Sequence, residues 1–315
     1  MNGLFWAQSD QGQVYTSETL SKIVRLAARR KQRFEQFARV DLALGYHAGD
    51  TYSFIKAGAL RHLGQAIGET DEVPETDFSS RKAYVTIQEI TNSIPYTERL
   101  TMHTKLSIED VAVSNLMYNM SLTLDHFAAA PLKTCDLVYV PTTTADELDY
   151  AFSTNGTAAA VADRMVTAWD VRNIVDMMRA DFNMPAYRNQ DYVCIATSNF
   201  LRGLKEDNDF VEIAKYGDPS RLLAGEVGRY YNVRFIEENS TLSNNLPGGG
   251  GQAIFLAFDA LIKVVCRPEE IQASLGKEWG RAKALRWVFI GAYTCPWDYA
   301  VDGEARCIRV DSAAA

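Results

Sequence analysis

No pair of cysteines in this 315-residue chain has the C-x-x-C spacing of a zinc ribbon or a redox motif. The five cysteines are odd in number and scattered, at Cys135, Cys194, Cys266, Cys295 and Cys307. This pattern excludes a disulfide framework and predicts free, buried thiols in a reducing compartment. If Asp302 and Gly303 form the turn of a C-terminal hairpin, Cys295 and Cys307 do not face each other.

The sequence also lacks the arrangements that catalysis or metal binding needs. The four histidines, His47, His62, His103 and His126, have no H-x-x-x-H or H-E-x-x-H spacing, which argues against a zinc site. The glycine run at 248–251 lacks the Lys-Ser/Thr continuation of a P-loop, and Cys194 lacks the glycines of a nucleophile elbow. We therefore expect no catalytic residue, no metal and no cofactor, and we interpret the glycine run as a flexible connection.

Long apolar runs and a net positive charge are absent too. The apolar stretch 253–265 is interrupted by Asp259 and Lys263, and residues 1–13 lack the basic start and apolar run of a secretory signal. The formal charge of −8 and the pI near 5.2 argue against a dedicated nucleic-acid-binding protein. An apolar share of 47% is ample for a core. We expect a folded protein without export or membrane spanning, whose nucleic-acid contacts are local.

Residues 17–40 reverse the acidic character of the chain. Apolar residues at helical spacing, from Leu20 to Phe37, predict an amphipathic helix. Its opposite face is basic, and the candidate contact residues there are Arg25, Arg29, Arg30, Lys31 and Arg33. This face is either a solvated helix surface or a surface for an acidic partner such as a scaffold, a neighbouring subunit or DNA.

Two strand-like segments, 50–56 and 83–90, are separated by about two dozen residues of weak periodicity. The first contains Tyr52, Phe54 and Lys56, and Lys82 precedes the second. A connection of this length without firm structure is unusual inside a compact domain. We expect an arm that becomes ordered on a neighbour; the alternative is a plain surface loop.

Capping signals and apolar periodicity predict the remaining elements. Ser107-Ile-Glu-Asp110 opens a helix at 107–130 that Pro131 is expected to stop, and Thr167-Ala-Trp-Asp170 opens another. Thr197 or Ser198 caps a third, and Gly225 and Gly228 bracket a tight passage into the strand that follows. Strands are predicted at 192–196, 233–237, 253–258, 285–294 and 305–310. The pattern is that of an α+β protein.

In their order, these segments resemble the major capsid proteins of tailed double-stranded DNA phages, which have the Hong Kong 97-type fold. Three passages carry the resemblance. They are 50–55 followed by 69–74; 84–100, running into the long helix; and 191–239, with a small-residue step at 222–228 and the motif V-R-x-x-E-x-N at 233–239.

The resemblance implies a division of the chain. Residues 1–48 would form an N-terminal arm with the basic helix, and residues 49–100 an extension loop that lies over a neighbouring subunit. Residues 101–139 and 252–315 would form a peripheral domain with the long spine helix, and residues 140–251 an axial domain at the centre of hexamers and pentamers. Gly225 and Gly228 are then candidate contacts at that centre.

The resemblance also implies a structural protein and not an enzyme, one that builds the icosahedral head around double-stranded DNA. Its partners would be copies of itself, a scaffolding protein, a portal, possible decoration proteins and non-specifically bound DNA, in a virion assembled in the host cytoplasm. The basic helix starts too early to leave room for a cleaved scaffolding segment, so we expect a separate scaffold. No crosslink is expected, since nothing identifies an acceptor for Lys56 or Lys82.

Two other functions remain open on the sequence. An encapsulin-like compartment shares the fold but encloses enzymes in place of DNA. A soluble enzyme would be a monomer of about 35 kDa.

Overall fold

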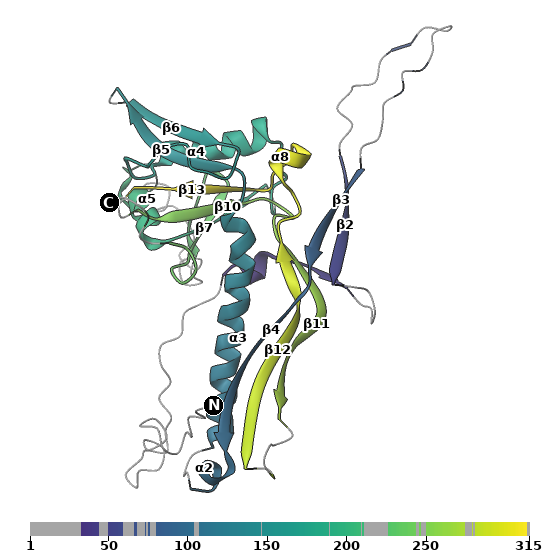
Figure 1. The fold of residues 1–315 in the computed structure, drawn as a ribbon. Coiled ribbons are helices and arrows are strands. Elements are labelled where there is room, and N and C mark those ends of the chain that lie inside the picture. Colours follow the sequence, from purple (N-terminus) through teal and green to yellow (C-terminus); the bar gives the residue numbers. More distant parts are fainter. Residues whose placement is uncertain are drawn as a thin grey trace.

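Two sheets, a long helix that connects them and a two-stranded ribbon make up the fold (Figure 1). The computed structural model describes residues 33–43, 50–58, 66–67, 73, 75, 80–103, 107–145, 147–188, 190–208, 210, 226–243, 246, 250–274, 279 and 281–313. The predicted α+β class is confirmed.

The larger sheet has the strand order β6-β5-β13-β10-β7-β9-β8. Its strands are β5 (Val138–Thr144), β6 (Glu147–Ser153), β7 (Tyr192–Ala196), β8 (Glu226–Tyr230), β9 (Val233–Glu237), β10 (Gln252–Leu256) and β13 (Cys307–Asp311). Every residue of β7 and β10 is buried. Along β7, Tyr192 and Cys194 enter one core, whereas Val193 and Ile195 enter another. Both faces are therefore covered, as a continuous apolar strand requires.

Helices cover the two faces of this sheet from opposite sides. One face packs against α4 (Ala168–Asp176), its π-helical extension η2 (Met177–Asp181) and α5 (Ser198–Glu206). The other receives Ala128, Ala129 and Leu132 from the end of α3 (Ile108–Lys133). The predicted caps are confirmed: Thr167 and Asp170 form a capping box, and the Phe200 amide donates to the Thr197 hydroxyl at 3.4 Å.

The smaller sheet lies along the rest of α3. Its order is β1-β11-β12-β4, with β1 (Arg39–Leu42), β4 (Gln88–Thr97), β11 (Ile262–Ala273) and β12 (Ala282–Thr294). Helix α3 has 26 residues, a rod of about 39 Å. Its Leu116 and Leu124 share a core with Trp287 and Phe289 of β12. The short helix α2 (Glu98–His103) follows β4 at the far end of this body (Figure 1).

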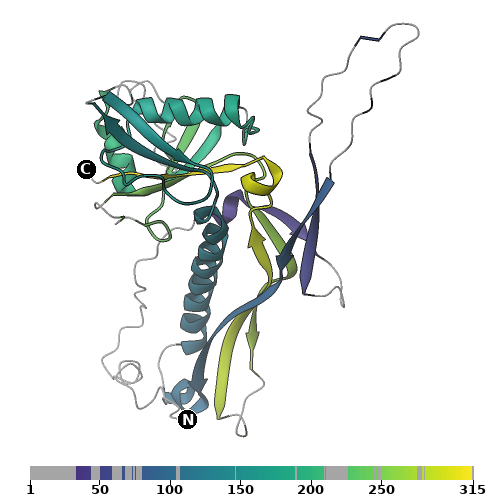
Figure 2. The ribbon, with the colours of Figure 1, turned by 45° about the horizontal axis from the view of Figure 1, so that its top comes forward.

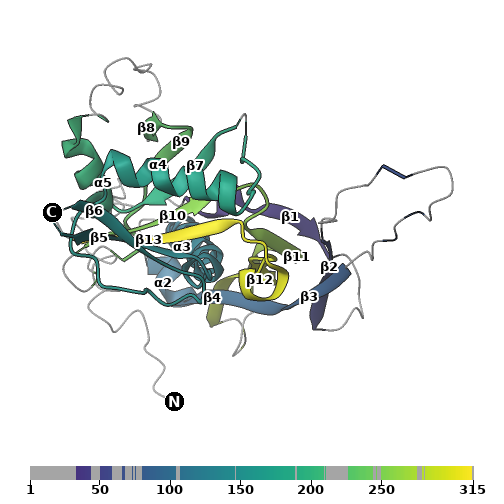
Figure 3. The same cartoon turned by 90° about the horizontal axis from the view of Figure 1, so that it is seen from above.

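The ribbon consists of β2 (Thr51–Ala57) and β3 (Ser80–Thr86), paired antiparallel from Thr51 opposite Thr86 to Ala57 opposite Ser80. The predicted pairing of 50–56 with 83–90 is confirmed for residues 83–86, whereas residues 88–90 belong to β4 and pair with β12. The ribbon leaves the smaller sheet at an angle (Figure 2), and seen from above it lies on the opposite side from the larger sheet (Figure 3). Such a placement leaves one face of the strand pair exposed, and a strand pair by itself is at best marginally stable.

Three boundary predictions are wrong. The helix predicted at 17–40 does not reach its end, because residues 35–37 form the single turn η1 (Glu35–Phe37) and residues 39–42 form β1; residues 17–32 lie outside the described residues. Helix α3 continues past Pro131 to Lys133, because Leu132 is held in the core beneath the larger sheet. The proposed C-terminal hairpin does not form: Asp302 ends the short helix α8 (Tyr299–Asp302), and Gly303 takes the left-handed conformation after it.

The division into domains also needs correction. Strands β10 and β13, assigned with residues 252–315 to the peripheral domain, lie in the larger sheet between β5 and β7. Strand β10 pairs with β7 of the 140–251 segment, and β13 pairs with β10 and with the start of β5. Strand pairing between distant segments therefore places both strands in the larger sheet. In the part of the chain that the structure describes, no helix is long and apolar enough to cross a membrane.

Candidate functional site: the ribbon and the contacts that hold it

The two faces of the ribbon differ in exposure. Along β2, Tyr52, Phe54 and Lys56 are half-buried and alternate with exposed residues. On the other face, Ile55 is 76% exposed and Tyr84 of β3 is 66% exposed. Large apolar side chains this exposed, on a projecting pair of strands, mark a surface suited to a partner.

Lys56 fastens the base of the ribbon to the body. Its ammonium group donates to the Pro296 carbonyl at 2.7 Å, forms an ion pair with Asp302, and lies 5.8 Å from the centre of the Trp297 ring. Arg81, opposite Lys56 in the register, donates to the Val301 carbonyl at 2.5 Å. These bonds lie within the subunit, and the role of Lys56 as a contact between subunits stays a prediction. Lys82 points to the exposed face, opposite Ile55.

Replacing Lys56 by methionine is expected to loosen the ribbon and to destabilise the fold by roughly 1–2 kcal/mol. The loss is limited because the Asp298 amide still donates to Asp302, at 3.1 Å. Faster hydrogen exchange of the β2 and β3 amides would report the loosening. Lys82→Met is the matched control and should leave exchange unchanged; equal exchange in both variants would contradict the role of Lys56.

Three cysteines meet near this junction, although Cys295 and Cys307 were not expected to face each other. The Cys135 thiol donates to the Leu137 carbonyl at 3.4 Å, and the Cys295 thiol to the Trp297 carbonyl at 3.5 Å. Contacts with both thiols, together with burial, raise the pKa of Cys307 well above its usual value. All five cysteines are free. The error arose from the hairpin itself, which does not form because β12 and β13 belong to different sheets.

Asp125 of α3 fixes the point where the chain enters the described fold. The backbone amides of Arg33, Phe34 and Glu35 all donate to its carboxylate, at 3.1, 2.7 and 3.1 Å. Lys263 of β11 pairs with Glu35 at 2.6 Å. This anchor holds Arg33, whereas Arg25, Arg29, Arg30 and Lys31 of the candidate basic face lie outside the described residues.

Asp170 is the polar centre of the larger-sheet body. Its fully buried carboxylate receives two hydrogen bonds from the Arg164 guanidinium, at 2.6 and 2.7 Å, and one from the Tyr139 hydroxyl at 2.7 Å. Arg164 also donates to the carbonyls of Thr142 and Asp149, at 2.8 and 2.7 Å. Burial, followed by the Asp170 charge, raises the pKa of Tyr139, so the phenol stays protonated.

Gly228 lies inside strand β8 and not in a turn. It sits where the β8–β9 register shifts, and a side chain there would come within 3.3 Å of the Phe210 ring. Tyr231 and Asn232, both with positive φ, form the turn into β9. The role of Gly228 as an inter-subunit contact stays a prediction, and Gly225 lies outside the described residues.

The described residues offer little to a reaction. None of their His, Cys, Asp and Glu side chains form a group of three able to hold a metal ion. Burial raises the pKa of the Cys194 thiol well above its usual value, which makes it inert.

The comparisons with known proteins point in one direction. No protein-family model and no curated protein matches the chain. Among solved structures, the capsid of Ralstonia phage GP4 matches with a TM-score of 0.70 at 16% identity, over 95% of each chain. The capsid subunit of cyanophage Pam1 matches with a TM-score of 0.70 at 15% identity, over 100% of each chain. The chain has the Hong Kong 97-type capsid fold.

A third capsid-fold structure, the head of Helicobacter pylori bacteriophage KHP40, has a TM-score of 0.66 at 14% identity and covers 94% of this chain and 95% of its own. The likeness therefore extends over the ribbon, α3 and both sheets. Identities this low explain why the fold is recognised through the order of elements and not through matching residues.

Sequence analysis missed several residues of this capsid fold. Ile55 and Tyr84 follow the same alternation as Tyr52 and Phe54, but alternation alone does not say which face of a ribbon turns outward. The roles of Asp125 and Asp302 carry no local signal, since Asp125 holds the amides of 33–35 and Asp302 holds Lys56, which lie 90 or more residues away in the sequence. Only the folded chain brings these groups together.

Proposed function

We propose that this chain is the major capsid protein of a tailed phage, which self-assembles into the hexamers and pentamers of an icosahedral head around double-stranded DNA. The observation that carries the proposal is the capsid fold over the full length of the chain, including the projecting ribbon. Copies of the chain are the main partner; a separate scaffolding protein, a portal and decoration proteins are further partners in the virion, with assembly in the host cytoplasm.

Exposed apolar surface on the ribbon supports this proposal. Ile55 and Tyr84 face away from the subunit, yet Lys56 and Arg81 hold the ribbon base to residues 296–302. A held strand pair presents its outer face in one orientation, and less ordering entropy is then lost on association. Many such moderate contacts become strong in a closed shell, because neighbours present one another at high effective concentration.

Sedimentation and electron microscopy of the purified protein test the proposal. Closed, fast-sedimenting shells are expected, with DNA in particles taken from phage-producing cells. A monomer of about 35 kDa would overturn the proposal. Particles that enclose protein and no genome would favour an encapsulin-like compartment.

The basic segment before Arg33 is proposed to contact DNA or scaffold. Changing Arg29, Arg30 and Lys31 to glutamine should lower the yield of DNA-filled particles severalfold and weaken the dependence of DNA retention on salt, because fewer phosphates are neutralised. A control with Arg202 and Lys205, both exposed on α5, changed to glutamine should behave like the wild type. Full genomes in both variants would refute this role.

A further inference from the structure

One end of the body presents a large aromatic side chain to solvent. Trp279 lies at the tip between β11 and β12, is fully exposed at 105%, and has a positive φ of 59°. Exposed tryptophan is costly in water, and it is among the residues most enriched at the energetic centres of protein interfaces. Met102 of α2, at the same end, is 74% exposed.

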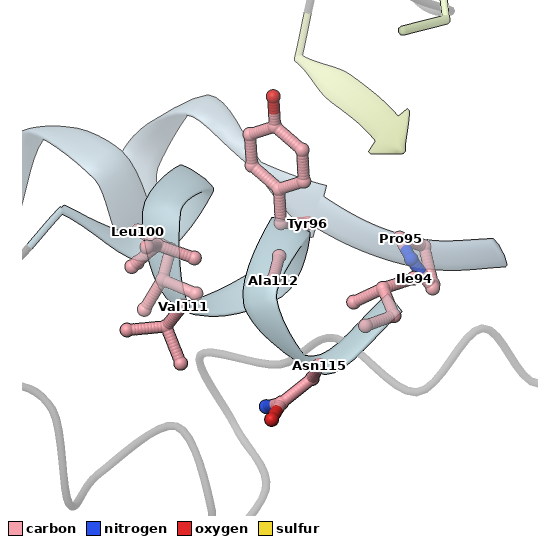
Figure 4. Close-up of a pocket in the computed structure, with 8 residues that line it drawn as sticks. Ile94, Pro95, Tyr96, Leu100, Val111, Ala112 and Asn115 are labelled. Atoms are coloured by element: carbon pink, nitrogen blue, oxygen red, sulfur yellow. The ribbon is translucent and has the colours of Figure 1, made fainter. Parts of the chain in front are cut away.

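The same end contains an apolar hollow. Strand β4, helix α2 and the first turns of α3 line it, with Tyr96, Leu100, Ala112 and Asn115 among the lining side chains (Figure 4). The hollow is small, with a cavity volume of about 50 Å³, and it is partly open to solvent. Trp279 does not fill it, because its own side chain is wholly exposed.

The charges around the two features are complementary. Arg281 and Lys283 follow Trp279, and Arg281 is exposed. Beside the hollow, Glu109 is exposed in the first turn of α3 and accepts a hydrogen bond from the hydroxyl of the lining residue Tyr96 at 3.0 Å. A carboxylate beside the hollow steers a basic tip toward the apolar centre.

We propose that the indole of Trp279 in one subunit enters the apolar hollow of a second copy of this chain, so that subunits join head to tail around this end of the body. Trp279 and the hollow are different surfaces of one chain, so the contact is heterologous. Subunits joined in this way form a closed ring when the rotation between neighbouring subunits permits it. The inference rests on the proposed assembly into shells and names the residue pair for one of its contacts.

Assembly of the Trp279→Ala variant gives the first readout. The protein concentration needed for shell formation should rise roughly tenfold or more, as expected for removal of a central aromatic anchor. Val161→Ser is the matched control, since Val161 is 70% exposed and lies in the larger-sheet body. It should assemble like the wild type.

Crosslinking gives the second readout, on soluble protein as well as on particles. Trp279→Cys and Asn115→Cys, treated with a short bis-maleimide, should form covalent dimers when the two single variants are mixed and a ladder of higher oligomers when one chain carries both changes. Each single variant alone measures the background from the native cysteines.

The outcomes separate this contact from assembly itself. If wild type and Trp279→Ala form shells at the same protein concentration, and the cysteine variants give no crosslinked oligomers, the contact is overturned and the proposed function is left intact. A crosslink confined to one chain would overturn it too, because Trp279 would then fill its own hollow. Absence of shells from the wild type would count against the proposed function, whereas a ladder in soluble protein would still support the contact.

Discussion

Replacing Asp170 by alanine is expected to destabilise the larger-sheet body by about 3–5 kcal/mol, the cost of leaving a buried cation unpaired. Arg164 would lose both hydrogen bonds to Asp170 while its side chain remains 12% exposed. The Tyr139 hydroxyl would lose its acceptor, and α4 would lose its capping box. A loss of this size is a large part of the stability of an ordinary domain.

Denaturant unfolding of the unassembled subunit measures the effect, read as a lower midpoint at an unchanged slope. Glu206→Ala is the control, because its ion pair with Arg202 is exposed on both sides and is worth little. If the unfolding midpoint of Asp170→Ala lies as close to the wild-type midpoint as that of Glu206→Ala does, the Asp170 network is dispensable.

Replacing Asp125 by alanine should cost roughly 2–4 kcal/mol, because a buried amide and two partly buried ones lose their acceptor together. Phe34, fully buried beneath the larger sheet, would lose the contact that positions it. Hydrogen exchange at Phe34 and Glu35 should accelerate sharply. Slow hydrogen exchange at Phe34 and Glu35 in the Asp125→Ala variant would mean that apolar packing alone holds this segment in place.

Asp125 also links stability to pH. Burial raises the pKa of Asp125 above its usual 3.8, although the three backbone amides act in the opposite direction. Between 3.8 and the raised pKa, the folded protein therefore binds more protons than the unfolded chain, and the free energy of unfolding falls as pH rises through that window. The contribution is constant above the window. Asp125→Asn should remove this slope, and an unchanged slope would contradict the assignment.

Local signals sufficed for the starts of the longer helices of this fold, whereas the short helices α2 and α8 were not predicted. Capping boxes and apolar spacing placed the starts of α3 and α4, because the first turn of a helix is decided by neighbouring residues. Pro131 misled the prediction, since packing of Leu132 under the larger sheet outweighs the preference of proline to end a helix. The pairing of β2 with β3 was also predictable, from two alternating segments around a long connection.

Long-range contacts were not predictable from the sequence. Asp302 and Gly303 have the composition of a hairpin turn, yet the chain between β12 and β13 crosses from one sheet to the other and passes Lys56 on the way. The same crossing brings Cys135, Cys295 and Cys307 together. Such contacts depend on which strands become neighbours, and single-segment patterns carry no information on that choice.

A cryo-electron microscopy reconstruction of the assembled particles tests the central claim most directly. The account predicts a closed icosahedral shell in which the exposed face of each ribbon, with Ile55 and Tyr84, lies against a neighbouring subunit while Lys56 stays bound to Asp302 of its own. A small closed oligomer, or a shell in which this face of the ribbon remains in solvent, would contradict it.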